Sequence, residues 1–237
     1  MGSSEIEQTA CPPRKVKLSA YAIDETEVTI TAFNDCIQFG NCEPIPLQCE
    51  FWLEDLVASG EVDEQYQSFL PAICITWPQA KTFCEFKGGR LPTEAEWEKA
   101  ARGTEASIWP WGSLFPDCNQ ANFRFPSYYC EAGVMPISSY YEWKSAYGLW
   151  DTTGNAWEWV ADYYDATYYT YAPDEDPMGP TEQCSSAIGE TAGECWLRGL
   201  RGGSFNSTHN TTRGAARSFA DPNLIDTNIG FRCAYDR

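Results

Sequence analysis

Histidine and positive charge are scarce in this 237-residue chain. It contains 1 His, and 16 Lys and Arg residues stand against 34 Asp and Glu, which gives a formal net charge of −18 at pH 7. A surface this acidic repels phosphate backbones, so we do not expect nucleic acid as a partner. A metal centre built on several imidazoles is excluded, because one histidine cannot hold a metal alone.

Long apolar runs are also missing. No stretch approaches the ~20 apolar residues that a membrane helix needs, so we expect no membrane span in this chain. No signal peptide begins at Met1 either. If the protein is exported, its targeting segment therefore lies before this numbering.

Closely spaced cysteine pairs of the kind that bind zinc are also absent. The chain has 11 cysteines but no C-x-x-C spacing, which a zinc site would show together with nearby histidines. Cytosolic proteins rarely keep so many cysteines without metal sites. We therefore expect disulfides and a secreted, periplasmic or cell-surface location. The odd count leaves one cysteine unpaired or paired outside this chain.

The residues that are abundant favour one aromatic-rich domain over residues 1–237. Hydrophobic residues make up 43% and aromatic residues 15%, enough for a core, while 18 Gly and 15 Pro indicate many turns rather than a helical bundle. Loop insertions are expected near residues 40–72 and 164–195. Apolar periodicity predicts helices at residues 29–39, 77–87 and 93–102 and strands at 16–23, 197–201 and 229–234.

Two local signals within these elements are specific. Thr93 followed by Glu96 predicts a capping box at the start of the third helix, with Gly103 as its end. Arg232 lies between Phe231 and Cys233 on a predicted strand, so it points away from both neighbours. We expect it to pair with a buried acid.

Sequence motifs follow one another over nearly the whole chain. They are IDETEVT at 23–29, GGRLPTEAEWE at 88–98, YGLWDTTGNAWEW at 147–159, RGGSF at 201–205, RGAAR at 213–217 and NIGFRC at 228–233. With these motifs in this order, the chain resembles the formylglycine-generating enzyme (sulfatase-modifying factor) superfamily. The resemblance implies an α+β fold, a single C-type-lectin-like domain with little regular secondary structure.

The family's catalytic cysteines are not present. In catalytic members, two cysteines after Gly-Gly-Ser bind copper and attack the substrate cysteine. Residues 204–213 contain no cysteine here, and the nearest matches to the two positions are Ser207 and His209. Copper(I) needs soft thiolate ligands, which serine cannot replace. Copper is therefore not expected, and we predict a pseudoenzyme rather than a formylglycine generator.

Three classes of function remain open. The first is a non-catalytic binding domain for a protein, peptide or small molecule. The second is a variable ligand-binding protein of a diversity-generating retroelement, because residues 206–212 are all of types that adenine mutation of Asn codons produces. The third is an oxidoreductase with an unrecognised site. The candidate ligand-binding residues are Phe205, Asn206, Ser207, Thr208, His209, Asn210, Thr211 and Thr212.

The resemblance also implies a structural disulfide between Cys84 and Cys233. The remaining cysteines are expected to pair locally, because irregular segments need short cross-links. The predicted local pairs are Cys36 with Cys42, Cys118 with Cys130, Cys184 with Cys195 and Cys49 with Cys74, which leaves Cys11 over.

A structural calcium site is implied by the resemblance. Its ligands would come from Asp151, Thr153, Gly154 and Glu158, and a second set would use Asn122 and the carbonyl of Phe123. Calcium takes about six to eight hard oxygen ligands, which carboxylates and carbonyls supply. The alternative is that the two acids cap local backbone and an asparagine holds the turn.

Overall fold

The computed structural model describes residues 1, 10, 12–60, 63–180 and 196–237. Short helices and strands are joined by long loops. The helices are α1 (Ile30–Gln38), α2 (Leu47–Ala58), η2 (Glu64–Phe69), α3 (Trp77–Phe86), α4 (Glu94–Arg102) and η3 (Tyr168–Thr170). The strands are β1 (Tyr21–Ile23), β2 (Trp157–Tyr163), β3 (Arg198–Arg201), β4 (Ser218–Ala220), β5 (Ile229–Phe231) and β6 (Ala234–Asp236).

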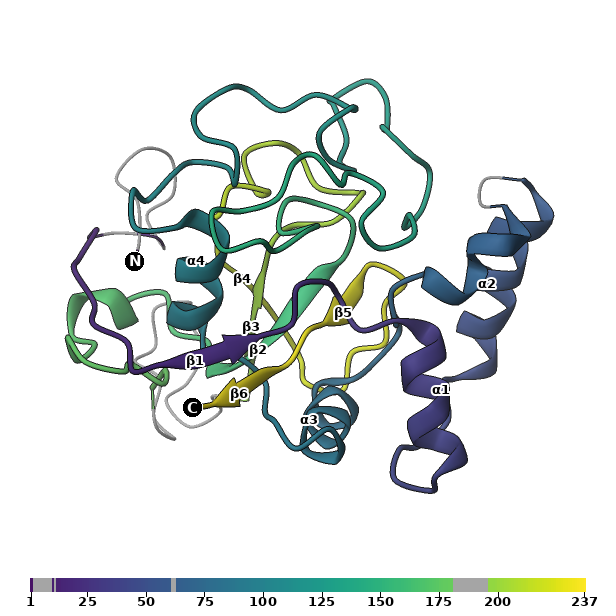
Figure 1. Ribbon diagram of the computed structural model, residues 1–237, viewed down its shortest axis with the longest axis horizontal. Helices are drawn as coiled ribbons and strands as arrows, with labels where there is room; N and C mark the ends of the chain where they lie inside the picture. The colour runs from purple at the N-terminus through teal and green to yellow at the C-terminus, as the bar shows by residue number, and fades with distance from the viewer. Residues whose placement is uncertain (2–9, 11, 61–62, 181–195) are drawn as a thin grey trace.

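The strands form a mixed sheet and a terminal pair. The four-stranded sheet has the order β4-β3-β2-β5, and β1 pairs with β6. Strand β2 runs antiparallel to β3 and parallel to β5. Loops 103–156 (teal) and 202–217 (yellow-green) gather above the sheet at the top of Figure 1. The fold is therefore α+β, as predicted.

The predicted helix starts agree with the structure. Thr29 caps α1, and Thr93 with Glu96 forms the expected capping box of α4. Gly103 ends α4 with a φ of 69°, a left-handed value that favours glycine. The threonine caps accept hydrogen bonds from backbone N–H groups three residues later. Because both partners are close in sequence, the sequence alone could predict them.

An aromatic cluster joins the first helices to the sheet. The ring centroids of Phe33 and Phe83 lie 5.6 Å apart, and those of Phe83 and Phe231 lie 5.4 Å apart. All three side chains are buried, with Cys84 and Cys233 in the same core. Helices α1 and α3 therefore pack on β5 through rings that come from both ends of the chain.

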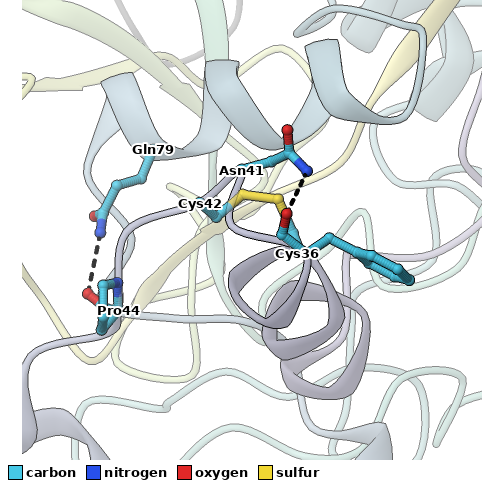
Figure 2. Close-up of a disulfide and its surroundings, with 6 residues drawn as sticks. Cys36, Asn41, Cys42, Pro44 and Gln79 are labelled. Carbon is cyan, nitrogen blue, oxygen red and sulfur yellow. Dashed lines mark hydrogen bonds between the residues drawn. A yellow bond between two sulfur atoms is a disulfide. The ribbon is translucent and has the colours of Figure 1, made fainter.

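Four of the five predicted disulfides are present. They are Cys36–Cys42, Cys49–Cys74, Cys84–Cys233 and Cys118–Cys130. Figure 2 shows how the first of these closes the loop after α1, where Gln79 of α3 donates to the carbonyl of Pro44. The pair Cys184–Cys195 and Cys11 lie outside the described residues.

Some predicted elements need correction. Residues 40–72 are not only loop, because they contain α2 and η2. Apolar residues occur around all of α2, so no one-sided pattern indicated it. Strand β2 was not predicted. Its sequence, WEWVADY, alternates apolar and polar residues except at Val160, but the polar Glu158 and Asp162 are buried, so both faces are covered. Of the strand predicted at 16–23, only residues 21–23 form a strand, β1. The single strand predicted at 229–234 is replaced by two strands, β5 and β6.

No helix among the described residues is long and apolar enough to cross a membrane.

Candidate functional site

The candidate segment, residues 205–212, leaves the sheet at the end of β3. Gly202 and Gly203 have φ values of 93° and 78°, so the chain turns sharply there. A Cβ on Gly203 would lie 2.7 Å from the Thr212 side chain, and one on Gly202 would lie 3.2 Å from the Trp97 ring. Only glycines allow this approach, which brings the two ends of the segment together.

Side chains within the segment divide into structural and exposed ones. Ser207 Oγ accepts the Ser204 N–H at 3.0 Å, and fully buried Thr212 donates from Oγ1 to the His209 carbonyl at 3.1 Å. The other polar side chains have some exposure, and Asn206 has the most. They are Asn206, Thr208, His209, Asn210 and Thr211.

A hairpin at residues 123–130 lies along the segment. The Arg124 N–H donates to the Ser207 carbonyl at 2.9 Å, and Arg124 Nε donates to the Asn206 carbonyl at 2.7 Å. Tyr129 also donates its hydroxyl to Asn206 Oδ1 at 3.4 Å. The Cys118–Cys130 disulfide ties the last residue of the hairpin to the preceding loop. Segment and hairpin therefore form one surface.

Aromatic rings surround this surface. Phe125 and Tyr128 stack with centroids 4.6 Å apart, and Tyr128 and Tyr129 are both half exposed. At the other side, exposed Phe115 lies 4.6 Å from the His209 ring. Phe205 faces inward and stacks on Trp52 at 6.3 Å. The site thus offers aromatic contact area and hydrogen-bonding groups to a ligand.

Ser207 and His209 do not form a nucleophile–base pair. The Ser207 hydroxyl is bonded to Ser204, and the His209 ring packs on Phe115. His209 Nδ1 is buried and has no hydrogen-bond partner in the part of the chain that the structure describes. A hydrolytic function would need these two side chains in hydrogen-bond contact.

Glu158, the last residue of the predicted calcium set, pairs with arginine instead. Its Oε2 accepts from Arg232 Nε at 2.6 Å and from Trp97 Nε1 at 2.7 Å, and its Oε1 accepts from Arg232 Nη2 at 2.8 Å. An arginine repels a calcium ion and already neutralises this carboxylate. As placed, the Glu158 side chain does not fit the role of a calcium ligand.

The other predicted calcium residues lie close together. Asp151 Oδ2 accepts the Ser138 N–H at 2.7 Å, and the N–H of Asn155, next to Gly154, donates to the Asn122 carbonyl at 2.8 Å. Thr153 Oγ1 and Asn122 Oδ1 are buried and have no partner among the described residues. The carbonyl of Phe123 accepts the N–H of Cys130 at 2.9 Å. No group of three His, Cys, Asp or Glu side chains in the described ranges is arranged to hold a metal.

Asn155 holds this turn together. Its Nδ2 donates to both carboxylate oxygens of Glu27, at 3.1 and 3.0 Å, and its Oδ1 accepts the Met135 N–H at 2.8 Å. Burial raises the pKa of Glu27 well above its usual range, and the negative charges of Asp151 and Glu158 add to this. Burial likewise raises the pKa of Asp151, to about 6. The buried cluster is short of positive charge.

A family model for the sulfatase-modifying factor enzyme 1-like domain matches residues 1–237. The chain belongs to this sulfatase-modifying factor family. A formylglycine-generating enzyme of Streptomyces coelicolor is 40% identical over 179 residues, covering 70% of this chain and 52% of that protein. An inactive C-alpha-formylglycine-generating enzyme 2 of Bos taurus is 30% identical over 203 residues, covering 80% of this chain and 58% of that protein. The chain thus spans little more than half the length of these relatives.

Solved structures of similar fold support the C-type-lectin-like architecture of the family domain. PvdO from Pseudomonas aeruginosa has a TM-score of 0.72 and 21% identity, and the match covers 100% of this chain and 90% of that one. Treponema denticola variable protein 1 has a TM-score of 0.65 and 22% identity, and the match covers 94% and 86%. At these identities the likeness concerns the fold alone.

Several residues of this family member's site were missed by sequence reasoning. Arg124, Phe115 and Tyr129 contact the segment from loops about 80 to 95 positions away, and no motif marks them. Glu27 lay inside a quoted motif, yet its bond to Asn155 joins residues 128 positions apart. The motif IDETEVT contains three acids, and nothing in the sequence distinguishes Glu27 from the other two.

Proposed function

We propose that this chain is a non-catalytic binding domain whose ligand surface consists of the segment 205–212 and the hairpin 123–130. One observation carries the proposal. Where the resemblance places catalytic cysteines, this surface has no thiol, and the Ser207 hydroxyl bonds to Ser204 while the His209 ring packs on Phe115. What it presents is aromatic and hydrogen-bonding surface.

The composition of the surface suits a protein or peptide ligand. Tyrosine rings give large, rigid contact areas at low entropy cost, and small polar side chains give adaptable hydrogen bonds. Tyr128 and Tyr129 are on a disulfide-anchored hairpin, while Asn206 and Thr208 project from the neighbouring segment. The surface therefore combines rigid anchors with replaceable polar groups. The name of the Bos taurus relative, which calls that protein inactive, agrees with a family member that does not turn over substrate.

A variable retroelement protein is the second candidate function. The observation that favours it is the division of the segment. The hydroxyls of Ser207, Thr211 and Thr212 bond to backbone groups of the segment and hold its turns. The side chains with some exposure that make no such bond are Asn206, Thr208, His209 and Asn210. Such positions tolerate exchange without loss of the fold. Treponema denticola variable protein 1 has the same fold. A near-identical template repeat beside the gene would support this candidate.

Location and calcium stay predictions. The disulfides favour a secreted, periplasmic or cell-surface location. Unpartnered oxygens at Asn122 and Thr153 support a bound calcium ion, and the pairing of Glu158 with Arg232 weighs against that carboxylate as a ligand. If an ion binds, the hard oxygen donors available to it are Asp151, Thr153, Asn122 and nearby carbonyls.

The proposal is tested by selecting random peptides displayed on phage against the oxidised protein. We expect the selected peptides to bind at least about tenfold more weakly to Tyr129→Ala and Asn206→Ala variants, because the hydrogen bond between these exposed side chains joins the hairpin to the segment. A Tyr66→Ala variant is the matched control, since Tyr66 is an exposed tyrosine in η2. Equal binding to all three variants would place the ligand elsewhere.

A second measurement addresses the catalytic alternative. The protein is incubated with copper(I) and a sulfatase-type peptide that contains cysteine, and oxygen uptake is followed. We expect none above buffer, because residues 205–212 have no thiolate. Copper-dependent uptake would support the oxidoreductase and overturn the binding-only function.

A further inference from the structure

A small pocket with aromatic walls opens beside the loop 109–117. Its lining includes the aromatic residues Trp111, Tyr140 and Trp143, which we call its walls, and the polar residues Asp151, Thr152 and Thr153, which we call its floor. We call it the Trp111 pocket. Its complete lining is Pro110, Trp111, Gln120, Ala121, Tyr140, Trp143, Asp151, Thr152 and Thr153.

The floor carries polar groups that lack protein partners. Thr152 and Thr153 are 1% and 3% exposed, and neither Oγ1 has a hydrogen-bond partner in the described part of the chain. Asp151 is 8% exposed beside them. The Asp151 carboxylate accepts the Ser138 N–H through Oδ2 at 2.7 Å, but no cation is paired with it among the described residues. Buried hydroxyls are costly without partners, and a buried carboxylate favours positive charge, so these groups favour a ligand that donates hydrogen bonds and is cationic.

The walls favour a cation as well. The rings of Trp111 and Trp143 meet nearly at right angles, at 75°, with centroids 5.8 Å apart. Burial raises the pKa of the Tyr140 hydroxyl, and the charges of Glu131 and Asp151 raise it further, so this phenol stays neutral. The faces of tryptophan and tyrosine rings attract cations, most strongly where water is excluded.

The size of the Trp111 pocket and its position next to the ligand surface limit which cation can bind. The pocket has room for about one water-sized group, which suits a primary ammonium and is too small for a trimethylammonium. Trp111 Nε1 donates to the Leu114 carbonyl at 3.0 Å, and the adjacent Phe115 contacts His209. One loop therefore joins this pocket to the ligand surface. The net charge of −18 draws cationic ligands to the whole domain.

We propose that the Trp111 pocket binds a primary ammonium group, such as a lysine side chain of a protein or peptide ligand. Asp151 and the two threonine hydroxyls accept its hydrogen bonds, and the rings of Trp111 and Trp143 surround its charge. The inference rests on the proposed binding function and names the chemistry of the ligand. Calcium, if bound at Asp151, competes for the same carboxylate, but aromatic rings are not calcium ligands.

The test uses chelator-treated protein labelled with 5-fluorotryptophan and followed by fluorine NMR. Trp111→Leu and Trp143→Leu variants assign two of the 10 tryptophan signals. The probes are Nα-acetyl-lysine methylamide, its ε-trimethylated form and the neutral Nα-acetyl-norleucine methylamide. We expect saturable shifts of both assigned signals with the lysine compound and none with the other two.

An Asp151→Asn variant removes the charge and keeps the backbone. Asp151 has a φ of 58°, and asparagine tolerates this left-handed conformation as well as aspartate does. We expect it to bind the lysine compound about fivefold or more weakly. Trp196→Leu, which changes a half-exposed tryptophan outside the pocket, is the control and should bind normally.

Three results would overturn the proposal: equal shifts with the lysine and norleucine compounds, equal binding of the trimethylated form, or shifts with calcium but none with the amine. Tyr129 and Asn206 do not line this pocket. The peptide selection on the ligand surface and the amine titration can therefore fail independently of each other.

Discussion

Glu158 and Arg232 form a doubly hydrogen-bonded ion pair in which neither side chain has any exposed surface. Strand β2 contributes the acid, and the residue just after β5 contributes the arginine. The remaining guanidinium hydrogens go to backbone carbonyls, those of Asp24, Glu25 and Trp150. The arginine thus ties the sheet to the bend after β1 and to the loop before β2.

Replacing this arginine should cost much of the domain's stability. Arg232→Met leaves Glu158 buried without its counter-charge, and breaking a buried pair in this way costs about 3–5 kcal/mol. Chemical denaturation monitored by tryptophan fluorescence measures the loss. Lys81→Met breaks the exposed pair of Lys81 with Glu85 and should change the free energy of unfolding by less than about 1 kcal/mol. Equal losses in both variants would contradict this account.

Local signals predicted the fold best. The capping box at Thr93 and Glu96 lies within four residues, and the alternation around Arg232 correctly indicated a buried acid as its partner. Helix α2 was missed because its apolar residues show no single face. Strand β2 was missed because its polar residues, Glu158 and Asp162, are buried against partners far away in sequence, which no local pattern indicates.

The site was predicted only where a motif crosses it. Residues 205–212 follow Gly-Gly-Ser, so their place was evident from the sequence. Arg124 and Tyr129 reach them through the fold, across distances that no periodicity encodes. For Glu158, the family resemblance implied a place beside Asp151 in a calcium site, but not its hydrogen-bond partner, which is Arg232 near the other end of the chain.

The two disulfides Cys84–Cys233 and Cys36–Cys42 should differ in their effect on stability. They span sequence separations of 149 and 6 residues. In the chain-entropy model, the longer loop stabilises the fold by about 5 kcal/mol and the shorter by about 2 kcal/mol. Double Cys→Ala variants of each pair, compared by thermal unfolding, measure the difference. A larger loss for Cys36–Cys42 would show that local strain or packing outweighs loop entropy.

Substitutions within the segment should separate stability from binding. Thr212→Ala removes a buried hydroxyl that bonds the His209 carbonyl, and we expect a loss of about 1–2 kcal/mol in unfolding free energy. Asn210→Ala, at a partly exposed side chain, should change it by less than about 0.5 kcal/mol. Denaturant midpoints measure both. A destabilising Asn210→Ala would count against the variable-protein candidate, because diversified positions must be replaceable.

Calcium is tested by unfolding with and without a chelator. A bound ion stabilises only the folded state, so its removal should lower the midpoint by several degrees. Asp151→Asn should reduce that difference in midpoint. Of the two carboxylates in the predicted calcium set, Glu158 is paired with Arg232, so Asp151 is the one left to bind the ion. An unchanged midpoint together with no metal in elemental analysis would remove the calcium prediction.

Asp162 should make the domain less stable as the pH rises. Its Oδ2 accepts the Glu94 N–H at 2.8 Å, and its Oδ1 is buried with no partner in the described residues. Burial, and next the charge of Glu94, raises the pKa of Asp162 to about 8. The folded state therefore binds more protons than the unfolded state between about pH 4 and pH 8, and stability falls across that range.

Asp162→Asn isolates this contribution. The amide carries no charge at any pH. The stability of the variant relative to the wild-type protein should therefore rise between pH 5 and pH 8, and the difference should level off above pH 8. Thermal midpoints at constant ionic strength, measured from pH 5 to pH 9, check the slope. Glu105→Gln, at an exposed acid, is the control and should follow the wild-type curve. A constant difference between Asp162→Asn and wild type over this range would mean that Asp162 is already ionised at pH 5.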